Sequence, residues 1–328
     1  MVDVAAHAGV SLKTVSRAIN SEPHVDPVLA ARVAASAEVL GYHRNSLAAS
    51  LRSGARDTIG FLSADLSNSF YSHIAAAASA VAVEHGMQLI VASSEEDANA
   101  EKALALDFCQ RRVGGLIVVP TASDHSYLAT EMERGTPSVF VDRPAHGIDA
   151  DQVLLDNRGG AYAAVKELLS AGHERIALLF DSLDIYTMAE RRAGACAAFA
   201  DAGRALDPRL TVSGLHTPEA ARAAMERILA HEPAPTAVFC ANNRVTIGVL
   251  EQLLPLRSDI ALSCFDDFEL SRVLPRAIRI VDYDTAELGR RATKMLIERI
   301  ATDASAKSST ELLPTRLITR GGTSTPGG

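Results

Sequence analysis

Residues 1–41 alternate apolar and polar positions with the spacing of short helices. The pattern predicts helices at Asp3–Ala8, Leu12–Asn20 and Pro27–Leu40. Gly9 lies between the first two, where a tight turn needs a positive φ, and Ser11 is a good N-cap for the second helix. The apolar positions expected to form the small core of this three-helix unit are Val4, Ala8, Val10, Val15, Ile19, Val33 and Leu40.

Beyond Thr58, short apolar runs alternate with amphipathic helical stretches. Buried parallel strands have the composition of such runs, and the helical stretches serve as crossovers between them. The runs form two sets of four, which predicts an α/β fold of two doubly wound parallel lobes with a ligand cleft at the carboxyl ends of their strands. The expected strands are 58–63, 87–92, 115–120, 138–142, 175–180, 210–214, 237–241 and 260–265.

The C-terminal part of the chain contains one more helical pattern, at Thr285–Ala301. We expect this helix to cross back and pack on the first lobe. From Thr302 onward the chain is rich in Ser, Thr and Gly and has no leucine heptads, so nothing in it indicates a tetramer.

Composition is that of an ordinary globular protein, with 48% hydrophobic and 22% charged residues among 328. The sequence shows neither a membrane-spanning apolar stretch nor a secretory signal, which favours a cytoplasmic location. The four cysteines are widely scattered, which argues against disulfides and zinc and favours core positions. Net charge is −8, yet residues 1–56 hold six basic and four acidic residues, so a basic head of +2 precedes a body of −10.

The second predicted helix carries polar side chains on one face that suit contact with DNA. Lys13 and Arg17 can donate to guanine edges, and Leu12 can meet a thymine methyl group. The hydroxyls of Thr14 and Ser16 suit phosphates. For any one of these residues a merely solvated helix face is the alternative explanation.

The chain resembles the lactose/galactose-repressor (LacI/GalR) family through residues 3–11 (DVAAHAGVS) and 14–17 (TVSR), with Asn20, Gly41-Tyr42 and Asn45. The resemblance extends over nearly the whole chain and implies a helix-turn-helix head with a type I periplasmic-binding-protein-like sensor. It implies that Leu12, Lys13 and Arg17 read bases in the major groove. The positions that it places on or near the phosphate backbone are Thr14, Ser16, Asn20, His24 and Tyr42.

Residues 45–52 resemble the hinge helix of that family. Eight residues are too few to hold a helix alone, so folding should require a partner hinge and DNA. Ala48 is small enough for two hinges to approach closely, Leu51 could wedge into the minor groove, and Asn45 and Arg52 are expected near DNA. A linker with buried leucines is the alternative.

These patterns together predict the domain limits. Residues 1–41 are expected to form the helix-turn-helix domain, 42–56 the hinge, 57–320 the sensor and 321–328 a disordered tail. Within the sensor the first lobe is expected at 57–156 and 285–306, and the second at 157–284 and 307–320.

A tetrapeptide after the first strand of the body places two aromatic rings, Phe70 and Tyr71, beside the amide of Asn68. Aromatic faces with convergent hydrogen-bonding groups suit a sugar ring. Paired aromatics at a helix start are, however, more often simply core residues.

Other polar residues fall at equivalent strand ends and complete a set similar to the clasp of periplasmic ribose-type binding proteins. Carboxylates and guanidinium groups can each engage two adjacent hydroxyls, so we expect a monosaccharide or related polyol as effector. The alternatives are a surface ion pair for Asp142 and Arg143 and a helix N-cap for Asp266. The expected effector-binding residues are Asn68, Phe70, Tyr71, Asp142, Arg143, Arg191, Asn242, Asp266 and Tyr283.

Asn243 and Tyr283 are among the positions that depart from the pattern of the family. Asn243 stands where Asp is usual and can still cap the helix that follows it. Tyr283 stands where Gln is common and should narrow or re-aim the pocket, so the identity of the sugar is not transferred from relatives.

The sequence therefore predicts a dimeric, nucleoid-associated repressor that binds a palindromic operator under control of a small ligand. No catalytic motif or metal-ligand spacing is found, and neither an enzyme nor a cofactor is expected. Two alternatives stay open: a regulator that responds to a nucleobase or another non-sugar ligand, and a sugar-binding protein with an impaired DNA-binding head. A transport receptor would need a secretory signal and no head.

Overall fold

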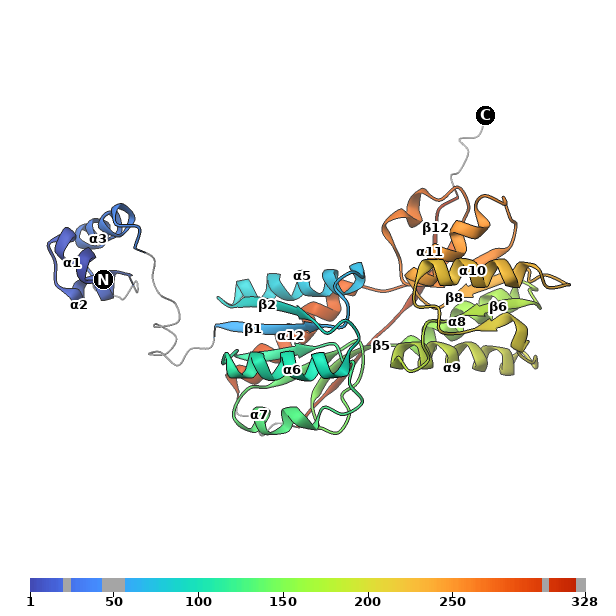
Figure 1. Cartoon of the computed structure of the whole chain (residues 1–328), viewed down its shortest axis with the longest axis horizontal. Helices are drawn as coiled ribbons and strands as arrows, with labels where there is room; N and C mark the ends of the chain where they lie inside the picture. Colours follow the sequence, from blue (N-terminus) through green and yellow to red (C-terminus); the bar gives the residue numbers. More distant parts are fainter. Residues whose placement is uncertain (20–24, 43–56, 303–306, 323–328) are drawn as a thin grey trace, which may run out of the picture. The chain divides into compact units, whose positions relative to one another are not determined.

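The computed structural model describes residues 1–19, 25–42, 57–302 and 307–322. The chain divides into two compact units, Met1–Asp57 and Thr58–Gly328 (Figure 1). Each unit has its own hydrophobic core.

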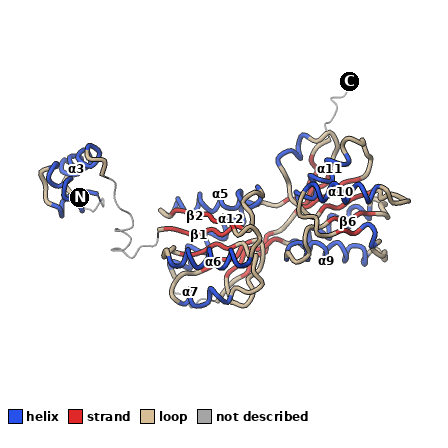
Figure 2. Tube along the Cα trace, viewed as in Figure 1, coloured by secondary structure: helices blue, strands red, loops and turns tan. Residues whose placement is uncertain are grey.

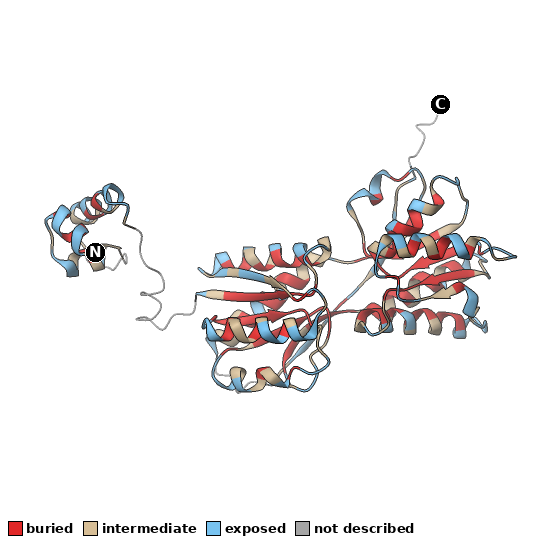
Figure 3. Cartoon of the chain, viewed as in Figure 1, coloured by how far each residue is buried: buried red, intermediate tan, exposed pale blue. Residues whose placement is uncertain are grey.

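The first unit is a three-helix head of α1 (Val2–Ala8), α2 (Leu12–Ile19) and α3 (Pro27–Val39). Gly9 ends α1 with a φ of 59°, the left-handed conformation expected of it. Ser11 caps α2, because its Oγ accepts a hydrogen bond from the Thr14 amide at 3.1 Å. Helices of the head carry buried positions (Figure 3). The buried core residues are Val4, Ala5, Ala8, Val15 and Val33, with Val10 and Ile19 packed against them.

One predicted core position of the head is wrong. Leu40 is 43% exposed. The third helix ends one residue earlier, at Val39, and Leu40 serves as its C-cap. Leu40 therefore lies beyond the helix, and its side chain does not continue the buried face that the periodicity predicted.

The second unit begins with an α/β lobe in which helices flank the strands of a sheet (Figure 2). This six-stranded sheet has the order β11-β5-β4-β3-β1-β2, and all its strands are parallel. The strands are β1 (Thr58–Ser63), β2 (Gln88–Ser93), β3 (Gly115–Val118), β4 (Ser138–Val141), β5 (Asp151–Leu155) and β11 (Thr310–Leu313). The helices are α5 (Ser69–Glu84), α6 (Ala98–Gln110), α7 (Ala129–Glu133) and α12 (Thr285–Ala301), with the 3₁₀ turn η1 (Ser126–Leu128).

The second lobe repeats this plan, with the order β12-β10-β9-β8-β6-β7 and only β12 antiparallel to its neighbour. Its strands are β6 (Ile176–Leu179), β7 (Thr211–Val212), β8 (Ala237–Cys240), β9 (Ala261–Phe265), β10 (Ile278–Asp282) and β12 (Arg316–Arg320). Its helices are α8 (Asn157–Ser170), α9 (Tyr186–Asp201), α10 (Pro218–Leu229) and α11 (Asn243–Leu253), with η2 (Pro208–Leu210) and η3 (Glu269–Val273).

The two doubly wound parallel lobes confirm the predicted fold class, but each sheet holds six strands and not four. The four missed strands are β5, β10, β11 and β12. Both β11 and β12 lie at sheet edges with partly exposed side chains, so they lack the continuous apolar run of a buried strand. The expected boundary at 306/307 is also wrong for β11, which pairs with β5 of the first lobe.

Helix α12 packs on α5 and the first sheet, as expected for a segment that crosses back from the second lobe. Gly289 permits this close approach, because a Cβ there would lie 2.2 Å from the carbonyl oxygen of Ile74. Cys109, Cys240 and Cys264 are buried and Cys196 is partly buried, and none of the four is joined in a disulfide. Within the described ranges, no helix combines the length and apolarity that a membrane crossing requires.

Candidate ligand cleft and DNA-reading helix

A cleft lies between the two lobes, where the carboxyl ends of their parallel strands face each other. It encloses a volume of about 50 Å³. All nine residues expected to bind the effector line it: Asn68, Phe70, Tyr71, Asp142, Arg143, Arg191, Asn242, Asp266 and Tyr283. In such folds, residues that follow the carboxyl ends of parallel strands form the ligand site, and this strand-end rule accounts for the meeting of residues from both lobes.

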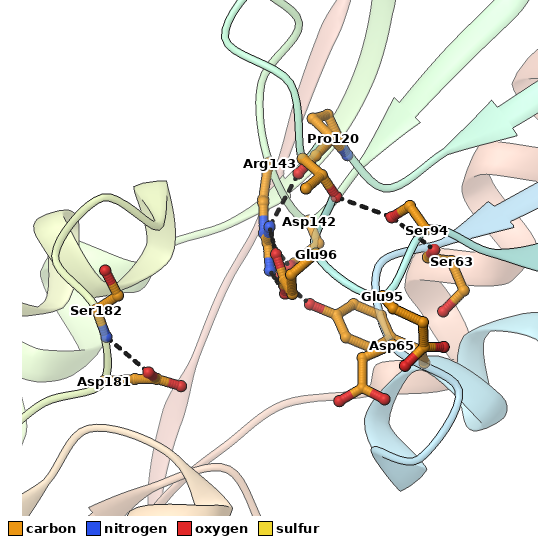
Figure 4. Close-up of polar contacts among 12 residues, drawn as sticks. Ser63, Asp65, Ser94, Glu95, Glu96, Pro120, Asp142, Arg143, Asp181 and Ser182 are labelled. Carbon is orange, nitrogen blue, oxygen red and sulfur yellow. Dashed lines mark hydrogen bonds and ion pairs between the residues drawn. The ribbon is translucent and has the colours of Figure 1, made fainter. Parts of the chain in front are cut away.

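On the first-lobe wall, the Arg143 guanidinium is held by four hydrogen bonds (Figure 4). Nη1 donates to Glu96 at 2.8 Å and to the Pro120 carbonyl at 3.0 Å. Nη2 donates to the second Glu96 oxygen at 2.6 Å and to the Tyr71 hydroxyl at 3.0 Å. The Arg143 side chain is only 7% exposed, so the alternative of a surface ion pair is wrong.

Asp142 precedes Arg143 on the same wall, in a left-handed conformation with a φ of 72°. Its carboxylate is buried and lies 3.7 Å from the Arg143 Nε. Burial raises the pKa of Asp142 to about 6, against the opposing pull of Arg143 and Arg191. A donor that reaches this carboxylate would favour its ionised form.

On the second-lobe wall, Arg191 of α9 is the central group. Its Nε donates to Asn157 at 2.8 Å, and its Nη1 donates to the Ala241 carbonyl at 2.6 Å and to Asp266 at 3.1 Å. The guanidinium carbon lies 3.6 Å from the centre of the Phe265 ring. Stacking and hydrogen bonds together fix the plane of the arginine.

Asp266 joins Arg191 to Tyr283, whose hydroxyl donates to the carboxylate at 2.6 Å. Burial and the neighbouring carboxylate raise the pKa of Tyr283, so its hydroxyl stays protonated and acts as the donor. The Asp266 side chain therefore binds side chains across the cleft wall, and the N-cap alternative is wrong.

Asn242, and not Asn243, caps helix α11. The Asn242 side chain accepts a hydrogen bond from the Val245 amide at 2.8 Å. The expectation that Asn243 is the cap is wrong, because Asn243 is already the first residue of the helix. Its side-chain amide instead donates a hydrogen bond to the Asn68 side chain of the first lobe at 3.2 Å.

The two aromatic residues have different surroundings. Tyr71 is buried in the core of the first lobe, as the core alternative proposed, and its hydroxyl still reaches the cleft wall at Arg143. Phe70 is half-buried and lies edge-on to Tyr71 and to Tyr283, with ring centres 4.9 and 6.2 Å apart. The cleft thus has an aromatic edge beside its charged groups.

Sequence reasoning missed eight residues that also line the cleft: Asp65, Glu96, Asp181, Ile185, Thr187, Met188, His216 and Arg244. Asp65 and Asp181 follow β1 and β6, so the strand-end rule could have found both. Arg244 of the second lobe donates to Asp65 and Ser67 of the first, each at 2.5 Å.

In the head, α2 exposes Leu12, Lys13 and Arg17, while Val15 on the opposite face is fully buried. Thr14 and Ser16 are half-buried, and Tyr42 packs against the head core. Six of the expected DNA-binding residues lie outside the described residues and stay predictions: Asn20, His24, Asn45, Ala48, Leu51 and Arg52.

A helix-turn-helix head joined to a two-lobed sensor defines a class of ligand-controlled DNA-binding proteins. Residues 1–45 match the model of the bacterial regulatory proteins of the lacI family, and residues 56–320 match that of the periplasmic binding proteins and sugar binding domain of the LacI family. The chain belongs to the LacI family. It is a DNA-binding transcriptional regulator whose operator affinity a small ligand controls, and not an enzyme.

Several known proteins are similar over nearly the whole chain. The ribose operon repressor of Escherichia coli K12 is 31% identical over 96% of this chain and 97% of its own. The transcriptional repressor PurR of Erwinia tasmaniensis is 30% identical over 97% and 95%. The Lac repressor bound to ONPG in its repressed state is 25% identical, with a TM-score of 0.84 over 96% and 97%.

Proposed function

We propose that this regulator is a repressor that binds a palindromic operator as a homodimer in the cytoplasm and responds to a monosaccharide or related polyol. The observation that carries the proposal is the convergence of Asp142, Arg143, Arg191 and Asp266 in one cleft between the lobes. The carboxylates can accept hydrogen bonds from adjacent hydroxyls beside the fixed guanidinium groups, and the aromatic edge matches the C–H face of a sugar.

The DNA-binding part of the proposal assigns residues 1–41 to the operator and 42–56 to a hinge. Leu12, Lys13 and Arg17 are exposed on α2 and would read base edges in the major groove. Thr14, Ser16 and Tyr42, with Asn20 and His24, would contact phosphates. In the hinge, Asn45, Ala48, Leu51 and Arg52 would meet the minor groove once DNA and the partner hinge are present.

The mechanism follows from linkage between the cleft and the head. A dimer must present its two α2 helices about one DNA turn apart, or ~34 Å. A ligand that changes the angle between the lobes moves the first lobes of the two subunits and with them the spacing of the heads. A coupling of ~1–3 kcal/mol is typical of such systems.

The operator is found first by selecting bound fragments from random DNA, and affinity is then measured by fluorescence anisotropy. Arg17→Ala should cost about 1–3 kcal/mol of operator binding and relax the sequence preference at one position of each half-site. Lys294→Ala, an exposed change on α12, is the matched control. If Arg17→Ala keeps full affinity and specificity, the base-reading role is wrong.

A nucleobase effector is the second candidate function. It is favoured by the Phe70 and Tyr283 rings at the cleft, which suit a flat heterocycle. Calorimetric titration with purine bases beside monosaccharides separates the two candidates.

A further inference from the structure

We propose that the cleft accepts only ligands without negative charge, and that Glu96 is the residue that sets this selectivity by occupying the Arg143 guanidinium. The inference rests on the proposed function, which places the effector in this cleft. It goes beyond that function by separating free sugars from sugar phosphates and sugar acids.

The charges that line the cleft do not balance. Five carboxylates (Asp65, Glu96, Asp142, Asp181 and Asp266) face three guanidinium groups (Arg143, Arg191 and Arg244). Each guanidinium already has a carboxylate partner, because Arg143 pairs with Glu96, Arg191 with Asp266 and Arg244 with Asp65. An anionic ligand would therefore enter a cleft that holds a surplus of two negative charges.

Arg143 has no hydrogen-bond donor left for an anion on its terminal nitrogens. Its Nη1 and Nη2 carry four N–H groups, and these donate to Glu96, Pro120 and Tyr71. Only Nε remains, and it is buried beside Asp142 at 3.7 Å. A phosphate that sought the usual fork on this arginine would have to displace the Glu96 carboxylate, a group of the same charge.

The ionised carboxylate of Asp142 can pair with a hydrogen-bond donor of a ligand, but not with an acceptor. Among the described residues no hydrogen bond is made to its carboxylate, although only 4% of the side chain is exposed. Asp181, the other surplus carboxylate, accepts from the Ser182 amide at 2.6 Å and contacts His216 at 3.0 Å. Hydroxyl groups of a neutral polyol can donate to Asp142, whereas a phosphate or carboxylate offers only acceptors.

The test uses matched ligand pairs in calorimetric titrations of the whole protein. D-ribose is paired with ribose 5-phosphate and D-galactose with galactose 1-phosphate. The neutral member that binds should do so at least about 100-fold more tightly than its phosphate ester, since like-charge contacts in a buried site are strongly unfavourable. An ester that binds within tenfold of its neutral partner would overturn the proposal.

Glu96→Gln supplies the variant, because it keeps the shape of the side chain and removes the charge that occupies Arg143. We expect this variant to reduce the ratio of the two affinities, for the neutral sugar over its phosphate ester, by at least tenfold. Glu95→Gln is the control, since Glu95 is the exposed neighbour that bonds Ser93 and does not line the cleft (Figure 4). If the affinity ratio in Glu96→Gln equals that of the native protein, Glu96 does not set the charge selectivity.

Inorganic phosphate decides the proposal even if none of the sugars binds. At low millimolar concentration, where general stabilisation by excluded salts is small, it should leave the thermal unfolding midpoint of the native protein unmoved and raise that of Glu96→Gln. A raised midpoint in the native protein contradicts the charge selectivity. Loss of sugar binding with an unmoved midpoint would instead count against the sugar as effector and leave the selectivity intact.

Discussion

The buried carboxylate of Asp142 lowers the stability of the folded protein when no ligand is bound. Its side chain lies among Arg143, Arg191, Asp266 and Glu96, and burial raises its pKa from 3.8 to about 6. The folded protein therefore binds this proton more tightly than the unfolded chain does, so its contribution to stability falls as pH rises from about 4 to about 6. The full change corresponds to about 3 kcal/mol at 1.4 kcal/mol per pKa unit.

Asp142→Asn removes this titration. We expect the variant to be more stable than the native protein at pH 8, and to show a smaller loss of stability between pH 4 and pH 6. Urea unfolding followed by circular dichroism at each pH measures both. If the free energy of unfolding depends on pH in the same way in both proteins, burial does not raise the pKa of this carboxylate.

At the residue scale, the sequence predicted groups that directly follow a strand and missed long side chains that reach the cleft from a turn or a helix. Asp142 and Asp266 directly follow β4 and β9, so position along the chain was enough to find them. Glu96 lies in a turn beyond β2 with a φ of 58°, and Arg244 lies inside α11. Their long side chains arrive only because the tertiary fold brings distant segments together, and no local pattern encodes that.

At the element scale, the buried central strands were predictable because both faces are covered and most positions are apolar. β8 (AVFC) and β4 (SVFV) are buried at all four positions. β11 (TELL) and β12 (RLITR) pair along one edge only and leave most of their side chains exposed or half-buried. Short segments of that kind do not differ from a loop in composition. Both strands were therefore missed, and the expected return to the second lobe was placed before β11 and not after it.

The contact of α12 with α5 offers a test of packing at the same scale. Gly289→Ala adds a methyl group where the Ile74 carbonyl oxygen lies 2.2 Å away, so the helices must separate. We expect a loss of about 1–3 kcal/mol in the free energy of unfolding, despite the better helix propensity of alanine.

Lys294→Ala, exposed on the same helix, serves as the control and should change stability by less than about 0.5 kcal/mol. Urea unfolding curves give both values. Equal stability of Gly289→Ala and the native protein would mean that α12 and α5 are not held at this close distance.

At the scale of the whole molecule, the cleft has room for water and not for a ligand. Its volume is about 50 Å³, whereas a cavity that takes up benzene measures about 150 Å³. The lobes must therefore move apart before an effector enters. Arg244 opposes this motion, because it bonds Asp65 and Ser67 across the cleft.

Arg244→Ala should increase the rate of ligand association about three- to fivefold, as expected when a partly buried ion pair no longer holds the lobes together. Stopped-flow tyrosine fluorescence suits the measurement, since the chain has no tryptophan. Arg204→Ala breaks a surface pair with Glu174 away from the cleft and should leave the rate unchanged. If both variants behave alike, the Arg244 contact does not control opening.

The central claim is that the cleft and the operator are coupled. The most direct measurement is the operator Kd by fluorescence anisotropy, without ligand and at a saturating concentration of the sugar found by calorimetry. We predict a change of about 5- to 150-fold, with sugar affinity altered by the same factor when operator is present. Asp266→Asn should keep the ligand-free operator Kd and lose the response, whereas the exposed Glu269→Gln keeps both. An operator Kd that does not change while the sugar is bound would contradict the account.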